Sequence, residues 1–264
     1  MFDAVEPMPA KTILITGASS GIGAALARTY AAPGNCLILW GRNEERLNAT
    51  AEPCRARGAA LETLCFDLAD FGRLVEKLEE ADLRKPIDLA IFNAGLGGSL
   101  PHDCAAQDVD SAERMASVNF TAPVIGANLI AARMAKRGRG QIVLVGSIAE
   151  RLPLPMAPVY AGTKAGLALF AEALGLRLAK YGVGVTLVSP GFVDTPMSRS
   201  LKEPRPFLIG ADAAAAIIAG KIERGARRIV IPWQFAVIRI ITGLVPRAIL
   251  RAVLTRLSRA PFVR

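Results

Sequence analysis

Tyr160 and Lys164 are the two residues whose types and spacing most plainly suggest chemistry. They lie four positions apart in PVYAGTKAGLALF, a segment with helical periodicity, so we expect both side chains on one face of a helix. A free phenol has a pKa of about 10, and a neighbouring ammonium favours its ionised form. Such a pair could exchange a proton with a carbonyl or alcohol oxygen. Chance also produces this spacing on many helices, so the pair alone leaves open a half-buried tyrosine beside a surface lysine.

Two further polar residues accompany this pair. Ser147 follows the apolar run QIVLVG, thirteen residues before Tyr160, and Asn119 lies in SVNF within an earlier helical segment. No G-x-S-x-G motif surrounds Ser147, so we do not expect acyl transfer. The single histidine, His102, has no second ligand type beside it, and no metal site is predicted.

A glycine-rich loop, TGASSGIG, comes directly after the apolar run KTILIT and before a helix-compatible segment. Glycines allow close backbone approach, and the N-terminus of the following helix presents unpaired N–H groups to a phosphate. The alternative is an ordinary tight turn between a strand and a helix. The residues expected to hold a nucleotide here are Gly17, Ser19, Ser20, Gly21, Ile22 and Gly23.

The elements that must position these residues alternate along the chain. Short apolar runs are separated by longer amphipathic stretches, a rhythm that predicts repeated βαβ units and a parallel sheet covered by helices on both faces. The expected strands are 11–16, 36–40, 61–66, 87–92, 141–146, 184–189 and 227–232. We therefore predict an α/β fold with a doubly wound, Rossmann-like parallel sheet in a single domain, residues 11–232, with an N-terminal tail (1–10) and a helical C-terminal tail (233–264).

The glycine spacing G-x-x-x-G-x-G, followed in order by Asn119, Ser147, Tyr160 and Lys164, resembles the short-chain dehydrogenase/reductase family, in its single-domain branch. The resemblance covers about residues 11 to 232 and implies an oxidoreductase that moves a hydride between a nicotinamide cofactor and a carbonyl or alcohol. It implies that Tyr160 donates or accepts the proton and that Ser147 hydrogen-bonds the same oxygen. Lys164 would bind the nicotinamide ribose, and Asn119 would hold a water that relays protons.

Further matches to the family concern the cofactor. They imply contacts from Asp67 and Leu68 after the third strand, from Asn93, Ala94 and Gly95 after the fourth, and from Pro190, Gly191, Val193 and Thr195 after the sixth. Phe92 stands where family members often have a second asparagine. After the second strand comes Arg42 rather than the acid that accepts from an NAD ribose, and a guanidinium suits a 2′-phosphate. NADP(H) is therefore favoured over NAD(H), although Arg42 could also be a solvated loop arginine.

Composition limits the partners and the compartment. The net charge is +9, but residues 224 to 264 hold nine arginines and no acid, so the excess belongs to the tail. No nucleic-acid-binding module is visible, and we expect no nucleic-acid partner. The four cysteines have no paired spacing, and the N-terminus lacks a secretion signal. These features favour a cytoplasmic protein, and no membrane-spanning segment is predicted.

The C-terminal tail has two interpretations. Its mainly apolar segment 233–245 and the segment 246–259, which puts leucines on one helical arc opposite arginines, resemble a helix lying on an anionic membrane surface. Equally, the tail could pack on its own domain, line the substrate cleft or contact a partner subunit in a homo-oligomer. The sequence thus predicts an oxidoreductase for a carbonyl or alcohol substrate, with apolar or lipid-like molecules among the candidates; the alternative is a catalytically idle, membrane-associated dinucleotide sensor. An epimerase or dehydratase would need a longer C-terminal substrate domain.

Overall fold

The computed structural model describes residues 10–101, 104–201 and 204–245, and all structural statements concern these residues. Its centre is a seven-stranded sheet in which every neighbouring pair of strands is parallel. In spatial order the strands are β3 (Ala60–Cys65), β2 (Cys36–Gly41), β1 (Thr12–Thr16), β4 (Leu89–Phe92), β5 (Gly140–Val145), β6 (Val183–Pro190) and β9 (Arg228–Ile231). All seven strands predicted from the sequence are confirmed.

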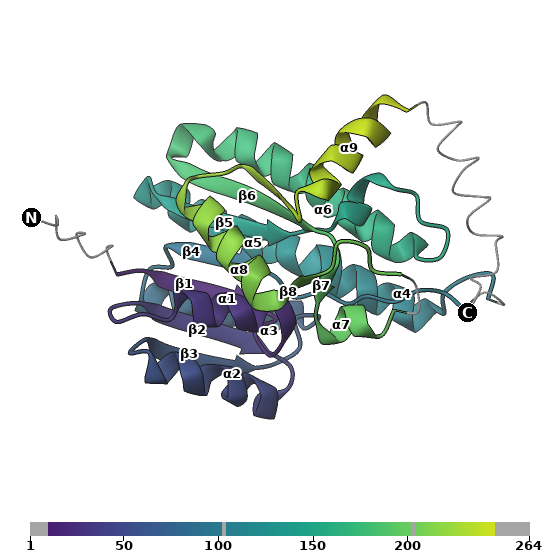
Figure 1. Ribbon diagram of the computed structural model, residues 1–264. Helices are drawn as coiled ribbons and strands as arrows, with labels where there is room; N and C mark the ends of the chain where they lie inside the picture. Colours follow the sequence, from purple (N-terminus) through teal and green to yellow (C-terminus); the bar gives the residue numbers. More distant parts are fainter. Residues whose placement is uncertain (1–9, 102–103, 202–203, 246–264) are drawn as a thin grey trace, which may run out of the picture.

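Helices cover both faces of this sheet (Figure 1). On one face lie α1 (Gly21–Tyr30), α2 (Glu44–Ala56) and α8 (Ala211–Glu223); on the other lie α3 (Phe71–Arg84), α5 (Ala122–Arg137) and α6 (Pro158–Leu178). Successive residues of a strand point to opposite faces, so Ile13 and Ile15 join the first core while Leu14 joins the second. The fully buried central strands explain why the sequence shows continuous apolar runs rather than alternation.

The strand order reverses direction between β1 and β4. In doubly wound sheets the loops leaving the carboxyl ends of the strands part at this point, which opens a crevice for a ligand. The glycine loop follows β1, and the Asn93–Gly95 segment follows β4, so both predicted nucleotide segments flank the crevice. The fold therefore brings these two motifs together although they are more than 70 residues apart.

The helix that carries Asn119 is irregular. Helix α4 (Val109–Ala116) continues into a π-helical turn (Ser117–Thr121) before α5 begins. Such turns are rare and frequently occur at functional sites. The continuous run Val109–Arg137 is long and apolar enough to cross a bilayer, but half of its most apolar window is buried within the protein, as in the core helix of a globular fold.

Most of the remaining elements lie beside the carboxyl end of the sheet. Strands β7 (Val193–Asp194) and β8 (Ile209–Gly210) form a small parallel pair, and α7 (Pro196–Arg199) lies between them in the sequence. None of these three elements was predicted. Short 3₁₀ turns occupy Ile148–Arg151 (η2) and Ala179–Tyr181 (η3). The helix expected at the start of the C-terminal tail is confirmed as α9 (Gln234–Leu244), which packs on β9 and η2. Residues 246–264, including the predicted amphipathic segment, lie outside the described residues, and the proposed domain limits stay predictions.

Candidate active site

A cleft of about 640 Å³ opens at the carboxyl ends of the strands. Most of the residues predicted to bind cofactor or carry chemistry line it. They are Gly17, Ser19, Ser20, Gly21, Ile22, Arg42, Asp67, Leu68, Asn93, Ala94, Gly95, Ser147, Tyr160, Lys164, Pro190, Gly191, Val193 and Thr195. Two predicted residues, Gly23 and Asn119, do not line the cleft and lie behind its wall. His102 lies outside the described residues.

The glycine loop is built for close backbone approach. Gly17 has a positive φ of 68°, and a Cβ there would come within 2.7 Å of the Ala94 Cα. A Cβ at Gly23 would overlap the Gly17 carbonyl, so Gly23 serves the packing of α1 against the loop. Ser20 is the N-cap of α1 but makes no side-chain capping bond, so the first N–H groups of the helix stay open toward the cleft. An uncapped, glycine-lined helix N-terminus suits a phosphate.

Asn93 fixes this loop against the neighbouring strand. Its side-chain amide donates to the carbonyls of Thr16 (3.1 Å) and Gly17 (3.2 Å). Its own backbone N–H donates to the Thr16 hydroxyl at 3.0 Å. The Asn93 side chain thus joins the ends of β1 and β4, and its position on the cleft wall follows from that role.

The cleft ends beside the start of α2, where the structure adds a residue that the sequence analysis missed. Arg46 lines the cleft together with Arg42 and Asn43, and both guanidinium side chains are exposed. The Asn43 carbonyl oxygen Oδ1 accepts from the Arg46 N–H at 2.8 Å and caps the helix. Arg46 follows Arg42 by four positions, and that spacing was the available signal. Two cations and a helix N-terminus form an anion-attracting corner.

The floor of this corner contains an unpaired hydroxyl. The Ser19 Oγ is buried and has no hydrogen-bond partner among the described residues. It lies against Gly41, where any Cβ would overlap it. A buried hydroxyl without a partner loses the hydrogen bonds that water would supply, so it is a site for a ligand oxygen.

Asp67 is already engaged within the protein. Its Oδ2 accepts from Arg114 at 2.6 Å, and its Oδ1 accepts from the Ala69 N–H at 3.0 Å. Burial raises the pKa of Asp67, but these hydrogen bonds and the charges of Arg114 and Arg42 outweigh it and hold the pKa below its usual value. Asp67 therefore remains a carboxylate on the cleft wall at neutral pH.

Tyr160 and Ser147 meet in the middle of the cleft. Ser147 ends the segment after β5 and caps η2, where its Oγ accepts from the Ala149 N–H at 3.1 Å. Burial raises the pKa of Tyr160, and a hydrogen bond to Ser147 lowers it in part. From the sequence we expected a neighbouring cation to lower the pKa of Tyr160, but in the structure the largest influence is burial, which raises it. Tyr160 is therefore a protonated phenol at neutral pH, which suits donation to a carbonyl oxygen.

Lys164 is buried beneath the phenol. Its Nζ lies 5.9 Å from the centre of the Tyr160 ring and donates to the Val145 carbonyl at 2.9 Å. Gly95, in the loop after β4, lies next to the ammonium. Burial lowers the pKa of Lys164 to about 8, while the charge of Glu150 opposes that shift. The predicted sharing of one helical face by Tyr160 and Lys164 thus corresponds to real proximity.

Asn119 is fully buried and its side chain is already bonded. Its Oδ1 accepts from the Leu96 N–H at 2.6 Å, and its Nδ2 donates to the Leu96 carbonyl at 2.8 Å. A weaker contact reaches the Thr163 hydroxyl at 3.4 Å. The amide therefore fixes the loop after β4 beside Lys164, and its expected role with a relay water stays a prediction.

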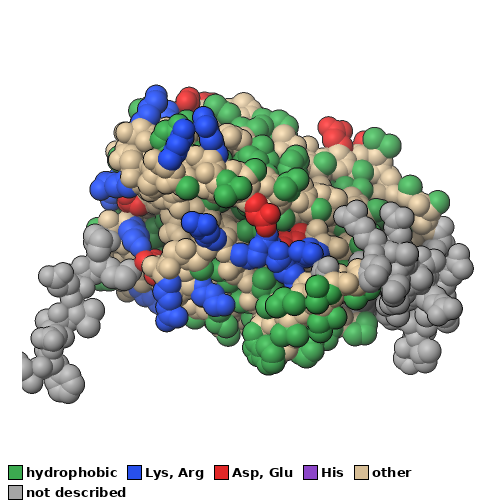
Figure 2. Space-filling view, turned by 90° about the horizontal axis from the view of Figure 1, so that it is seen from above, with side chains coloured by type: hydrophobic (Ala, Val, Ile, Leu, Met, Phe, Trp, Pro, Cys, Tyr) green, Lys and Arg blue, Asp and Glu red, His purple; other side chains and the backbone are tan. Residues whose placement is uncertain are grey.

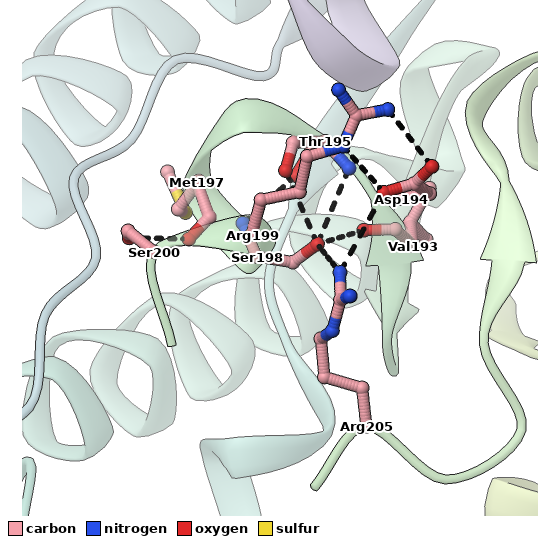
Figure 3. A network of polar contacts seen from close by, with 8 residues as sticks. All are labelled: Val193, Asp194, Thr195, Met197, Ser198, Arg199, Ser200 and Arg205. Carbon is pink, nitrogen blue, oxygen red and sulfur yellow. Dashed lines mark hydrogen bonds and ion pairs between the residues drawn. The ribbon is translucent and has the colours of Figure 1, made fainter. Parts of the chain in front are cut away.

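The segment after β6 contributes residues to one side of the cleft and contains a network of polar contacts, which Figure 3 shows. Asp194 accepts two bonds from Arg199, at 2.8 and 2.9 Å, and lies 3.6 Å from Arg205. Thr195 caps α7: its Oγ1 accepts from the Ser198 N–H, and the Ser198 hydroxyl accepts from the Thr195 N–H, both at 3.2 Å. These bonds hold β7 and α7 in a defined shape with Thr195 facing the glycine loop at Gly21.

The part of the cleft beyond Tyr160 is apolar, and its lining was not predicted residue by residue. It is formed by Leu96, Leu152, Leu154, Met156, Phe192, Met197, Leu201 and Phe235. Phe235 comes from α9 and packs edge-on against Phe192, with ring centres 6.0 Å apart. The start of α9 therefore lines the cleft through Phe235, which is one of the alternatives considered for the tail.

A doubly wound sheet with a phosphate-binding loop, and with a phenol, a hydroxyl and an ammonium meeting at its crevice, defines a dinucleotide-binding oxidoreductase. The sequence model described as short chain dehydrogenase matches residues 11–206. The chain belongs to the short-chain dehydrogenase/reductase family, as the resemblance predicted, and it is an enzyme that acts on CH–OH or C=O groups.

Three relatives illustrate the extent of the similarity. An uncharacterized oxidoreductase of Myxococcus xanthus is 30% identical over 256 residues, which cover 95% of this chain and 98% of that protein. A short-chain dehydrogenase of Sphingobium yanoikuyae, solved in complex with NADPH, has a TM-score of 0.77 at 29% identity and covers 96% of this chain and 98% of its own. A bulky-bulky ketone specific alcohol dehydrogenase of Comamonas testosteroni has a TM-score of 0.76 at 27% identity and covers 96% of each chain.

Proposed function

We propose that this enzyme uses NADP(H) to reduce or oxidise an apolar carbonyl/alcohol substrate, with Tyr160 as the proton donor or acceptor. The observation that carries the proposal is the meeting of Tyr160, Ser147 and Lys164 between a glycine-lined nucleotide wall and an apolar wall of one cleft. The named relatives are oxidoreductases, which supports turnover and gives no support to the alternative of an idle sensor.

The residues present fit a nicotinamide dinucleotide. The uncapped N-terminus of α1 and the glycine loop would hold the pyrophosphate, and Lys164 would donate to ribose hydroxyls. When bound, the cofactor supplies or accepts the hydride at its nicotinamide ring. The unpaired Ser19 hydroxyl and the exposed Arg42 and Arg46 side chains would hold an adenosine 2′-phosphate.

The protein residues would manage the proton. In reduction, the Tyr160 hydroxyl donates its proton to the carbonyl oxygen as negative charge develops there, and the Ser147 hydroxyl donates a hydrogen bond to the same atom. The Lys164 ammonium, beneath the ring, stabilises the phenolate that remains. In oxidation the Tyr160 hydroxyl first loses its proton to solvent, and the resulting phenolate then accepts the alcohol proton, so the geometry serves both directions.

We base the preference for NADP(H) on the positive charge that lines the cleft beside the start of α2. Arg42 and Arg46 line this part of the cleft, whereas the acidic residues of the same helix turn, Glu44 and Glu45, do not. The Sphingobium yanoikuyae relative was solved with NADPH, which agrees with this reading. The direct comparison of KM for NADPH and NADH with one carbonyl substrate tests it; a lower KM for NADH would overturn it.

The apolar wall supports a bulky, apolar substrate. Aliphatic and aromatic side chains contribute favourable free energy in proportion to the apolar area they remove from water, about 25 cal/mol per Å². The relative from Comamonas testosteroni acts on bulky-bulky ketones, which is consistent with this substrate class. We expect turnover of ketones with two large apolar substituents, or of lipid-like carbonyl compounds, to exceed that of small polar ketones.

Turnover of a carbonyl panel with NADPH tests the central proposal. We expect oxidation of NADPH at 340 nm that depends on a bulky ketone and that falls about 100- to 10,000-fold in Tyr160→Phe, because the ring remains and only the transferable proton is lost. Cofactor binding with no turnover of any substrate would instead favour the sensor.

We also propose that α9 contributes to contact with an anionic membrane surface in the cytoplasm. Ile240 and Leu244 are 67% and 82% exposed, and Figure 2 shows an apolar patch over this part of the molecule. The arginines of residues 224–264 would add electrostatic attraction to acidic headgroups. Assembly into a homo-oligomer through this face stays an alternative.

Co-sedimentation with vesicles containing phosphatidylserine separates these readings. We expect the full chain to bind, and Ile240→Glu/Leu244→Glu to bind less. The matched control is Leu169→Glu/Leu176→Glu, which alters two exposed leucines on α6. Equal binding of all three proteins would contradict membrane contact through α9, and a smaller assembly of the α9 variant in solution would favour the oligomer.

A further inference from the structure

A buried carboxylate lies behind the catalytic residues and does not line the cleft. Glu150 belongs to η2, three residues after Ser147, and only 3% of its side chain is exposed. Its Oε2 accepts from the Ser189 hydroxyl on β6 at 2.8 Å. The Glu150 N–H also donates to the Ser147 carbonyl at 3.1 Å, so this residue is bonded both to Ser147 and to β6.

The other oxygen of Glu150 faces cations from two further elements. Oε1 accepts from Arg228 on β9, and it lies 4.0 Å from the Arg239 Nε on α9. Arg228 also donates to Glu172 on α6, whose side chain is 55% exposed. The Arg239 Nε is buried without a hydrogen-bond partner among the described residues, so α9 directs an incompletely satisfied cation toward Glu150.

Lys164 contacts the same short segment from the cleft. Its Nζ donates to the Val145 carbonyl, one residue before Gly146. Glu150 is the acid whose charge raises the pKa of Lys164 against the lowering by burial, and the net value is about 8. A buried ammonium is costly without a nearby negative charge. The ammonium and the carboxylate residue thus both contact the Val145–Ser147 segment, and their opposite charges attract each other across it.

We propose that Glu150 is a positioning residue of this enzyme: its carboxylate holds the Gly146–Ser147 segment in place and supplies the negative charge that balances the Lys164 ammonium. The groups facing Glu150 are Ser189, Arg228 and Arg239, and those facing Lys164 are the Val145 carbonyl and the Tyr160 ring. Arg228 and Arg239 hold the carboxylate, and through them β9 and α9 are joined to the catalytic segment. The catalytic meaning of this arrangement rests on the proposed function of Lys164, but the charge balance itself does not.

Two glutamates bind the same arginine, and this provides a matched pair of variants. Glu150→Gln keeps the shape of the side chain and removes the charge beside Lys164, and it leaves one acceptor oxygen for Arg228 while its NH2 group can donate to the Ser189 hydroxyl. Glu172→Gln removes an equal charge from the other side of Arg228, at an exposed position. Glu150→Asp keeps the charge and shortens the side chain by one methylene.

Competitive trace acetylation of the cofactor-free enzyme measures the result without requiring turnover. The Lys164 amine reacts only when deprotonated, and because it lines the cleft a small reagent such as acetic anhydride can reach it. We expect its titration midpoint near pH 8 in the parent, lower by about half a pH unit or more in Glu150→Gln, and close to the parent value in Glu172→Gln and Glu150→Asp. Equal midpoints in Glu150→Gln and Glu172→Gln would overturn the proposal.

Kinetics provide a second readout that a merely structural role would not move. The alkaline limb of the kcat profile is expected to shift to lower pH in Glu150→Gln, in parallel with the acetylation midpoint, and to stay in place in Glu172→Gln. If the parent shows no turnover, the proposed function fails while the acetylation comparison still tests Glu150. An unshifted limb in an active Glu150→Gln enzyme would overturn the inference alone.

Removing one partner of a buried ion pair can unfold a protein, because the other charge is left uncompensated. If Glu150→Gln does not fold, Glu150→Gln/Arg228→Gln replaces the pair by two neutral amides, and Arg228→Gln alone is its control. We expect the Lys164 midpoint to be lower in the double variant than in Arg228→Gln. Equal midpoints in these two proteins would overturn the proposal.

Discussion

The two walls of the cleft differ in their chemical composition. The nucleotide wall consists of backbone and small residues after β1 and β4, tied together by the bonds from Asn93 to Thr16 and Gly17. The opposite wall consists of large apolar side chains from the loop after η2, from the segment around α7 and from α9. The first wall would bind a ligand mainly through backbone N–H groups, and the second through the shape of its apolar side chains.

This difference separates two kinds of specificity. A wall of N–H groups and glycines accepts one shape of pyrophosphate and tolerates little change, because an added Cβ at Gly17, Gly23 or Gly41 would overlap a neighbour. A wall of leucine, methionine and phenylalanine accepts many apolar shapes and can be changed without loss of the fold. Ser147, Tyr160 and Lys164 also line the cleft, and in the proposed reaction the apolar wall alone would select the substrate.

The largest effect is expected where the walls meet. In Ser147→Ala the substrate oxygen loses a hydrogen-bond donor as charge develops on it, so kcat should fall about 100- to 1,000-fold, with the affinity for cofactor unchanged. Ser147→Thr keeps a hydroxyl and should recover part of the rate. Steady-state kinetics with a bulky ketone and isothermal titration of NADPH measure the two quantities. A loss of cofactor affinity equal to the loss of kcat would place Ser147 on the nucleotide wall instead.

The second prediction concerns the contribution of Arg42, on the nucleotide wall, to the KM for NADPH. Arg42→Gln removes a charge-assisted hydrogen bond worth about 1.5 to 3 kcal/mol, so the KM for NADPH should rise about 10- to 100-fold, with little change for NADH. Arg55→Gln, an exposed arginine in the last turn of α2 and outside the cleft, is the matched control. Equal changes for NADPH and NADH in Arg42→Gln would show that the guanidinium does not contact a 2′-phosphate.

A smaller effect is expected on the apolar wall. Phe235→Leu removes part of an aromatic surface packed on Phe192, so the KM for a bulky ketone should rise about tenfold, with the KM for NADPH unchanged. Ile240→Ala changes an exposed residue of the same helix and should leave both constants unaltered. A change in the KM for NADPH without a change in the KM for the ketone would show that Phe235 contacts the cofactor rather than the substrate.

The smallest effect concerns the stability of the nucleotide wall. A Cβ in Gly41→Ala would overlap the Ser19 hydroxyl, and the resulting strain should lower the free energy of unfolding by about 1 to 3 kcal/mol. Ser19→Ala/Gly41→Ala removes the overlapping atom and should recover most of that loss. Gly220→Ala, on an open face of α8, should instead be neutral or stabilising. Urea titrations measure all three, and an unchanged Gly41→Ala would contradict the tight contact.

The sequence predicted the nucleotide wall far better than the apolar wall. Apolar runs revealed all seven strands of the sheet, and the glycine loop, Asn93 and Arg42 stand next to strand ends, where local spacing predicts their place. Arg46 was overlooked although its spacing from Arg42 could have revealed it. The two-residue strands β7 and β8 were missed because each is too short to produce a periodic pattern.

Local periodicity and fixed spacing were enough to predict the parallel sheet, the position of the nucleotide loop and the joint occurrence of Ser147, Tyr160 and Lys164. Other features could be seen only in the folded protein: burial governs the pKa of Tyr160, Phe235 enters the cleft, and Glu150, held by Arg228 and Arg239, opposes the lowering of the Lys164 pKa. The physical reason is that burial and charge balance depend on distances between segments far apart in the chain, and no local pattern specifies those distances.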